Sequence, residues 1–346
     1  MYYFVRPILP VSVRRHFQKM ALRDGRKRPF PKWPVDWTVE ILLERLLILA
    51  MKAKRVEEIP FIWFWPEGFR SCTIVTHDVE TTRGRDHCAA LMDINESFGI
   101  KSSFQVVPEG RYEVPDEYLE NIRRRGFEIN VQDLNHDGGL YSCKEEFLRR
   151  AKQINRHLAD YRAQGFRAGV LYRNVEWYEA LAIAYDMSIP NVAHLDPQRG
   201  GCCTVFPYFI GNILELPVTM AQDYTLFHIL GDYSIELWKK QIGLILEKNG
   251  LVSVIIHPDY IIDARAERTY RALLGYLRQL RAEGKTWVCL PQEVNAWWRA
   301  RRAMRLVNGN GKWRIEGEGK ERARIAYARR SGDEVVYTVE GERGRD

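Results

Sequence analysis

Residues 72–80, CTIVTHDVE, join a run suited to a buried β-strand to three residues that bind protons or metal ions. The run is rich in β-branched side chains, which favour a strand. Asp78 and Glu80 are two residues apart, so their side chains lie on the same face of an extended chain. Two carboxylates placed together can divide labour, one binding a cation and the other accepting a proton. The alternative is that each carboxylate caps the next helix or pairs with an arginine.

From Thr73 onward, short β-rich runs alternate with segments of helical periodicity. This alternation predicts parallel strands joined by crossover helices. Seven or eight such units over roughly 230 residues suit a closed or nearly closed (β/α) barrel. An open doubly wound sheet is the alternative, but no glycine-rich phosphate loop follows any strand. The β-rich runs are TIVTH, SSFQVV, FEINV, FRAGVLY, NVAHL, ILELPV, LVSVIIH and TWVCL.

Three regions follow from the composition along the chain. Residues 1–70 are predicted to form an N-terminal extension rich in Pro, Trp and Arg, with one or two helices. Its aromatic-proline stretches, FPKWPVDWTVE and FIWFWPEG, are suited to covering a neighbouring core. Residues 71–300 form the predicted α/β barrel. Residues 301–346 contain short alternating runs separated by Gly and charged turns, which predicts a small β-meander docked on the barrel.

The charge distribution and the cysteine spacing indicate which kinds of partner and which cellular compartment to expect. The net charge is +7, but Lys and Arg are spread along the chain without a basic helix or an aromatic-basic motif, so we expect no nucleic-acid partner. The six cysteines lack CxxC spacing, which argues against a zinc knuckle and a disulfide scaffold. With no export signal evident, we expect a cytoplasmic protein.

The most apolar helical segment is VEILLERLLILAMKAK, residues 39–54. It contains Glu44 and Arg45 and is too short to cross a bilayer, so we expect no transmembrane segment. Its apolar spacing indicates an amphipathic helix packed on the protein. Peripheral contact with a membrane is the alternative.

Polar and titratable residues collect where the predicted strands end. In a parallel barrel the chemistry lies at the carboxyl ends of the strands. Gln132 and His136 are four residues apart, and one helical turn would place both on one face as paired metal ligands. A lone histidine such as His257 is, alternatively, a hydrogen-bonded core residue. The strand-end residues are His77, Asp78, Glu80, Gln132, Asp133, Asn135, His136, Asp137, Arg167, Arg173, His194, Asp196, His257 and Asp259.

The order of five motifs resembles the polysaccharide deacetylase family, of the carbohydrate esterase family 4 type. The motifs are THDVE, EINVQDLNHDG, GFRAGVLYRN, ILELPV and IIHPDY, over roughly residues 70–295. The resemblance implies a distorted (β/α) barrel and removal of N-acetyl, sometimes O-acetyl, groups from sugars. It also implies a single divalent metal, usually zinc, with Mn, Co or Ni as alternatives.

The resemblance also implies roles for individual residues. Asp78 would be the catalytic base and Glu80 a metal ligand, or the reverse. Arg167 would orient the base and His257 would act as general acid. His136 matches the second histidine of the family's H-x-x-x-H metal motif.

The sequence departs from the family pattern at two positions. Gln132 stands in place of the first metal histidine, and amide groups are poor zinc ligands, although harder metals tolerate them better. Gly169 stands where the third motif has its usual proline. His77 is a candidate replacement ligand if its side chain turns inward.

We expect Tyr172, Arg173 and Asp259 to contact the substrate, with Tyr141 and Trp177 extending an aromatic sugar platform. The main hypothesis is a metal-dependent hydrolase that removes N-acetyl groups from an amino-sugar polysaccharide or glycan precursor. The second is a degenerate deacetylase fold that binds a glycan without turnover, because of Gln132. A third is hydrolysis of another C–N bond, since barrels of this type differ mainly in their loops.

Overall fold

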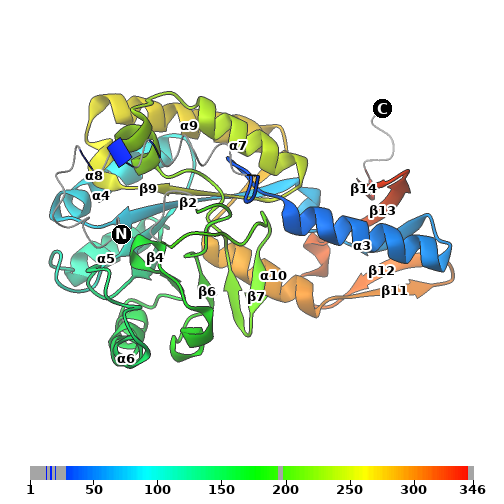
Figure 1. Ribbon diagram of the computed structural model, residues 1–346, viewed down its shortest axis with the longest axis horizontal. Helices are drawn as coiled ribbons and strands as arrows, with labels where there is room; N and C mark the ends of the chain where they lie inside the picture. Colours follow the sequence, from blue (N-terminus) through cyan, green and yellow to red (C-terminus); the bar gives the residue numbers. More distant parts are fainter. Residues whose placement is uncertain (1–12, 14–15, 18–19, 21–28, 194–197, 342–346) are drawn as a thin grey trace.

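The computed structural model describes residues 29–193 and 198–341, together with Val13, His16, Phe17 and Met20. His194 and Asp196, two of the strand-end candidates, lie outside the described residues. The central element is a curled, mostly parallel sheet with helices packed around it (Figure 1). The prediction of a distorted α/β barrel is confirmed.

The central sheet has nine strands. Along its path the order is β10-β2-β3-β4-β5-β6-β8-β7, and β9 pairs with the other side of β2. All pairs are parallel except β7 with β8. The strands are β2 (Ser71–Val79), β3 (Ser103–Val106), β4 (Glu128–Gln132), β5 (Gly165–Arg167), β6 (Tyr185–Asp186), β7 (Tyr208–Ile210), β8 (Ile213–Glu215), β9 (Leu251–Ile256) and β10 (Thr286–Val288).

On its far side from β2, strand β9 is met by loop residues rather than by a strand. Thr219 Oγ1 donates to Leu251 O at 2.7 Å and accepts from Ser253 N at 2.9 Å. Leu251 N donates to Val205 O at 2.7 Å. These bonds satisfy the edge of β9 and bring the two sides of the barrel together.

Helices cover the outer face of the sheet because each has one apolar side. Leu91, Ile122, Ile154, Ile242 and Leu277 come from five different helices and are all buried in one core. The helices are α4 (Thr82–Ser97), α5 (Asp116–Arg124), α6 (Lys144–Asp160), α7 (Glu236–Glu247), α8 (Pro258–Ile261), α9 (Ala264–Ala282) and α10 (Pro291–Ala303). Short helical turns are η1 (Pro66–Gly68), η2 (Gly169–Leu171), η3 (Val175–Ala180), η5 (Lys320–Arg322) and the π-helical η4 (Tyr224–Leu230).

The N-terminal extension and the C-terminal segment share a sheet. After α3 (Thr38–Lys54), β1 (Glu58–Ile62) pairs antiparallel with β13 (Ile325–Ser331), which pairs with β14 (Glu334–Val339). The hairpin of β11 (Arg305–Gly309) and β12 (Lys312–Glu316) is separate. Strand β1 is an addition to the helices expected in the extension. It contains Pro60, which is tolerated because β1 is an edge strand.

Aromatic residues of the extension close one end of the barrel. Trp63 and Trp65 are buried against Cys72, Leu251 and Trp287, at the amino-terminal ends of the strands. Trp65 Nε1 also donates to the carbonyl of Asn249 at 2.6 Å. The extension therefore covers a core at the amino-terminal ends of the strands, and the carboxyl ends are left for a site. None of the helices within the described ranges combines the length and apolarity needed to cross a membrane.

Candidate functional site

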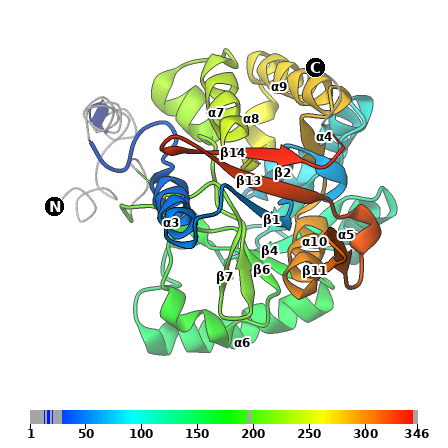
Figure 2. The ribbon, with the colours of Figure 1, turned by 90° about the vertical axis from the view of Figure 1, so that its right-hand side faces the viewer.

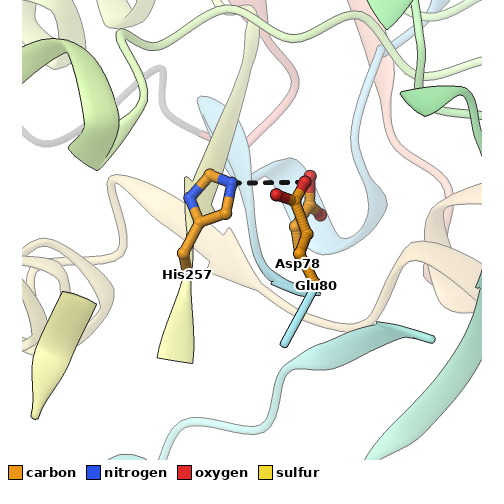
Figure 3. A group of neighbouring side chains, drawn as sticks. All are labelled: Asp78, Glu80 and His257. Atoms are coloured by element: carbon orange, nitrogen blue, oxygen red, sulfur yellow. Dashed lines mark ion pairs between the residues drawn. The ribbon is translucent and has the colours of Figure 1, made fainter. Parts of the chain in front are cut away.

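Three of the predicted residues meet at the carboxyl end of the barrel. Asp78 is near the end of β2, Glu80 follows it, and His257 follows β9. β2 and β9 are adjacent parallel strands, so their carboxyl ends lie together. One ligand atom of each of the three side chains lies within 4.8 Å of the others. Figure 3 shows the imidazole facing the two carboxylates.

Glu80 lies close to three other side chains of the site through one carboxylate oxygen. Its Oε1 accepts from Gln132 Nε2 at 2.9 Å and lies 2.9 Å from His136 Nε2. The same oxygen lies 3.6 Å from His257 Nε2. Burial alone would raise the pKa of Glu80, but the hydrogen bonds and charges of the two histidines hold its pKa well below the ordinary value. Glu80 is therefore an anion, the form in which a carboxylate binds a metal ion.

Asp78 is held by a buried arginine. Its Oδ1 forms an ion pair with Arg167 Nη1, and its Oδ2 lies 3.4 Å from Gln132 Nε2. Arg167 is fixed in turn, because Nη1 donates to Thr76 Oγ1 at 2.9 Å and Nε to Met187 O at 3.0 Å. Burial raises the pKa of Asp78, with Arg167 and His257 opposing the rise. A carboxylate oriented in this way, with a raised pKa, suits a general base.

His257 is oriented by a residue that we did not predict. Asp223 accepts from the backbone N of His257 at 2.6 Å and lies 2.7 Å from its Nδ1. Burial alone would lower the pKa of His257, but Asp223 and Glu80 outweigh it and hold the pKa well above the ordinary value. The ring is an imidazolium whose Nε2 faces Glu80. In the sequence, Asp223 follows no strand and reads as the cap of η4, a role that it also fills.

His136 reaches the cluster from a loop rather than from a helical turn. Gln132 is the last residue of β4, and His136 has a φ of 53° in the loop that follows, so the expected helical spacing is wrong. Two arginines hold this loop in place through hydrogen bonds. Arg111 Nη2 donates to the carbonyl of His136 at 2.5 Å, and Arg150 Nη1 donates to Asp137 Oδ1 at 2.7 Å. The loop doubles back and brings His136 to Glu80.

Gly169 leaves room for the carboxylate of Asp133. A Cβ on Gly169 would lie 2.5 Å from Asp133 Oδ2, a distance that heavy atoms do not tolerate. Asp133 Oδ1 accepts from Leu134 N at 2.7 Å, while Oδ2 is buried without a hydrogen-bond partner. The proline expected in the third motif would occupy the space that this carboxylate fills.

His77 does not reach the site. It precedes Asp78 on β2, so its side chain points to the opposite face of the sheet. There it packs against Phe104 and Tyr270, with Nε2 3.0 Å from Asn95 Nδ2. Burial lowers the pKa of His77 to about 3, so it is a neutral core residue. The idea that it turns inward as a replacement ligand is wrong.

The three expected substrate contacts have different surroundings. Asp259 lies in the first turn of α8, next to His257, and its Oδ1 is buried without a hydrogen-bond partner. Tyr172 lies beside the loop of His136, because a Cβ on Gly138 would be 3.9 Å from its ring. Arg173 is engaged with backbone, donating to Leu171 O at 3.1 Å and to Arg199 O at 3.2 Å.

The two other platform aromatics pack on α6. The ring centroids of Tyr141 and Trp177 lie 5.0 Å and 5.5 Å from that of Phe147, a buried residue of α6. Both rings therefore pack against the buried Phe147.

The sequence matches no protein-family model and no curated protein. Its structure is similar to two proteins assigned as polysaccharide deacetylases and to the allantoinase PuuE. The protein from Mycobacterium smegmatis has 17% identity and a TM-score of 0.56, covering 73% of this chain and 98% of its own. The one from Pseudomonas aeruginosa PAO1 has 12% identity and a TM-score of 0.52, with coverages of 67% and 91%. The allantoinase has 12% identity and a TM-score of 0.53, covering 68% of this chain and 92% of its own. The chain has the fold of the polysaccharide deacetylases.

Proposed function

We propose that the protein is a metal-dependent hydrolase that removes N-acetyl groups from an amino-sugar polysaccharide or glycan precursor. The observation that carries this proposal is the meeting of an arginine-held carboxylate, an anionic glutamate and an aspartate-held imidazolium. Asp78, Glu80 and His257 supply these three groups within 4.8 Å. Together they provide a base, a metal ligand and an acid at one point.

The donor set fits a single divalent ion, with Glu80, His136 and Gln132 as its ligands. Glu80 Oε1 and His136 Nε2 are 2.9 Å apart and face each other. Gln132 Oε1 is buried without a hydrogen-bond partner, and exchanging the two ends of its amide would turn this oxygen toward Glu80. The set of one carboxylate, one imidazole and one amide accepts zinc, manganese, cobalt or nickel. When bound, such an ion supplies a water of lowered pKa and polarises the acetyl carbonyl.

The protein's own residues carry the proton transfers. Asp78 accepts the proton of the attacking water, and Arg167 keeps the carboxylate aimed at it. His257 donates a proton from its imidazolium to the departing sugar amine, with Asp223 holding the ring in place. Each such acid–base role contributes about 10²–10⁴-fold to the rate.

A second candidate function is glycan binding without turnover. It is favoured by Gln132, whose Nε2 bridges the carboxylates of Asp78 and Glu80 at 3.4 and 2.9 Å. A neutral amide that cross-links two carboxylates stabilises the site without an ion. Hydrolysis of another amide is a third candidate, since the chain shares its fold with an allantoinase.

Acetate release tests the proposal. The purified protein is loaded separately with zinc, manganese, cobalt or nickel and incubated with N-acetylglucosamine oligomers and peptidoglycan fragments. We expect acetate from the wild type, a loss of at least about 10²-fold in Asp78→Asn, and no change in Asp116→Asn on the exposed first turn of α5. Absence of acetate with every metal, together with saturable glycan binding, would favour the binding protein instead.

A further inference from the structure

The side of α3 that faces away from the protein is apolar. Leu42, Leu43, Leu46 and Leu49 are 52%, 60%, 61% and 61% exposed. Leu42, Leu46 and Leu49 follow the i, i+4, i+7 spacing of one helix face, and Leu43 extends it. We refer to these four residues as the leucine face. Figure 2 shows α3 at the periphery of the molecule.

The polar contacts of α3 lie on its inward side. Glu40 is buried and accepts from Val205 N at 3.1 Å, and Glu44 forms an ion pair with Lys248 at 2.8 Å. Ile48 and Met51 are buried on the same side. A helix on a globular protein ordinarily turns its apolar stripe inward and its charges outward. In α3 both acidic residues point inward and leucines point outward.

The charges that border the leucine face are positive. Arg45, Lys52 and Lys54 are exposed on the outward half of the helix. Lys52 pairs with Asp333 at 3.0 Å. Glu40 and Glu44 are the only acidic residues in α3, so an approaching surface meets leucine bordered by basic side chains.

The chain that precedes α3 is strongly basic. Of the 52 Lys and Arg residues, eight lie in residues 1–30, and of the 45 Asp and Glu residues only Asp24 does. The remainder of the chain carries 44 of each sign. The whole net charge of +7 therefore lies in the segment that leads into α3.

We propose that the leucine face of α3, together with the basic residues that border it, Arg45, Lys52 and Lys54, binds the surface of an anionic lipid bilayer. A contiguous exposed apolar patch marks an interaction site. Apolar side chains that enter the interface and basic residues that pair with lipid phosphates are the two components of interfacial binding. A second copy of the chain is less suited as the occupant, because it would bring Arg45 and Lys54 of one copy near those of the other.

Vesicle co-sedimentation of the full chain tests this proposal. One vesicle set contains phosphatidylcholine alone, and the other contains phosphatidylcholine with phosphatidylglycerol. We expect binding to the anionic vesicles, at least about fivefold weaker in 0.5 M salt. Leu46→Glu/Leu49→Glu should bind at least about tenfold more weakly. Leu148→Glu on α6 is the matched control, since Leu148 is also an exposed helical leucine at 40% exposure. It should bind within about twofold of the wild type.

Thermal unfolding of each variant tests whether the fold is intact. We expect midpoints close to that of the wild type, because the substituted side chains are exposed. Equal binding to both vesicle sets, or equal binding by Leu46→Glu/Leu49→Glu and the wild type, would overturn the proposal. A dimer in sedimentation velocity that disappears in Leu46→Glu/Leu49→Glu would assign the face to a second copy instead. Vesicle binding requires no turnover, so its failure is distinct from failure of the proposed hydrolysis.

Discussion

Asp223 binds His257 at two points, through the backbone N–H at 2.6 Å and the ring Nδ1 at 2.7 Å. The double contact fixes the ring and leaves Nε2 facing Glu80, 3.6 Å away. Because Nδ1 faces a carboxylate, it carries a proton, and the ring can give its second proton from Nε2. The arrangement suits the proposed role of His257 as the general acid.

Asp223→Asn should lower the rate of acetate release by about 10²-fold or more, because an amide stabilises the imidazolium less than a carboxylate. The carboxylate holds the pKa of His257 above its ordinary value, so the acid form persists to high pH in the wild type. In the variant that pKa falls, and the upper limb of the pH–rate profile should move to lower pH. Asp232→Asn, a half-buried neighbour whose Oδ1 accepts from Ser234 N at 2.8 Å, is the control. An unchanged profile in Asp223→Asn would contradict this role.

Arg167→Met should destabilise the fold as well as the reaction. It leaves the carboxylate of Asp78 buried without its ion-pair partner. Breaking a buried pair in this way costs about 3–5 kcal/mol of unfolding free energy. Urea unfolding of Arg167→Met, Asp78→Asn and the double variant forms a cycle. We expect the double variant to be more stable than Arg167→Met alone, and additive losses would rule out this coupling.

Gln132→His should bind zinc at least about tenfold more tightly than the wild type, because imidazole is a better zinc ligand than an amide. The side chain leaves the end of β4 beside Glu80 and Asp78, so a histidine there completes a set with Glu80 and His136. Calorimetric titration of metal-free protein with zinc measures the change. Gln132→Ala, which removes the amide without adding a ligand, is the control. Equal affinities in all three proteins would place the metal elsewhere.

The buried carboxyl of Glu128 should make the free energy of unfolding depend on pH, independently of the proposed reaction. Burial raises the pKa of Glu128 from 4.5 to about 7, although Tyr185, Gln292 N and Asn130 donate hydrogen bonds to it. Its contribution to stability is complete below pH 4.5 and is lost as the pH rises through 7. This difference corresponds to about 3 kcal/mol. Urea unfolding between pH 5 and 8 should show this fall in the wild type and a smaller one in Glu128→Gln; parallel curves would contradict it.

The sequence predicted the parts of the site that depend on strand ends. Asp78, Gln132 and Arg167 lie at or near the ends of β2, β4 and β5, three strands of one parallel sheet whose carboxyl ends lie at the same edge. The two-residue period of the same strand could also have shown that His77 points the other way from Asp78 and Glu80.

Other features depend on contacts between distant segments. The position of His136 depends on Arg111 and Arg150 pinning a loop, and no spacing along the chain encodes these contacts. Asp223 reads as a helix cap, and its second role needs β9 beside it. The pairing of β1 with β13 joins segments more than 250 residues apart, so neither strand alone indicates its partner.

Acetate release as a function of added metal tests whether the proposed hydrolysis depends on an ion held by Glu80. Protein stripped of metal is titrated with zinc while acetate from an N-acetylglucosamine oligomer is measured, for the wild type and for Glu80→Gln. We expect acetate release that rises from the background and saturates at one equivalent of zinc per chain in the wild type, and that stays at background in Glu80→Gln. Release that is indifferent to stripping, or as strong in Glu80→Gln as in the wild type, would contradict it.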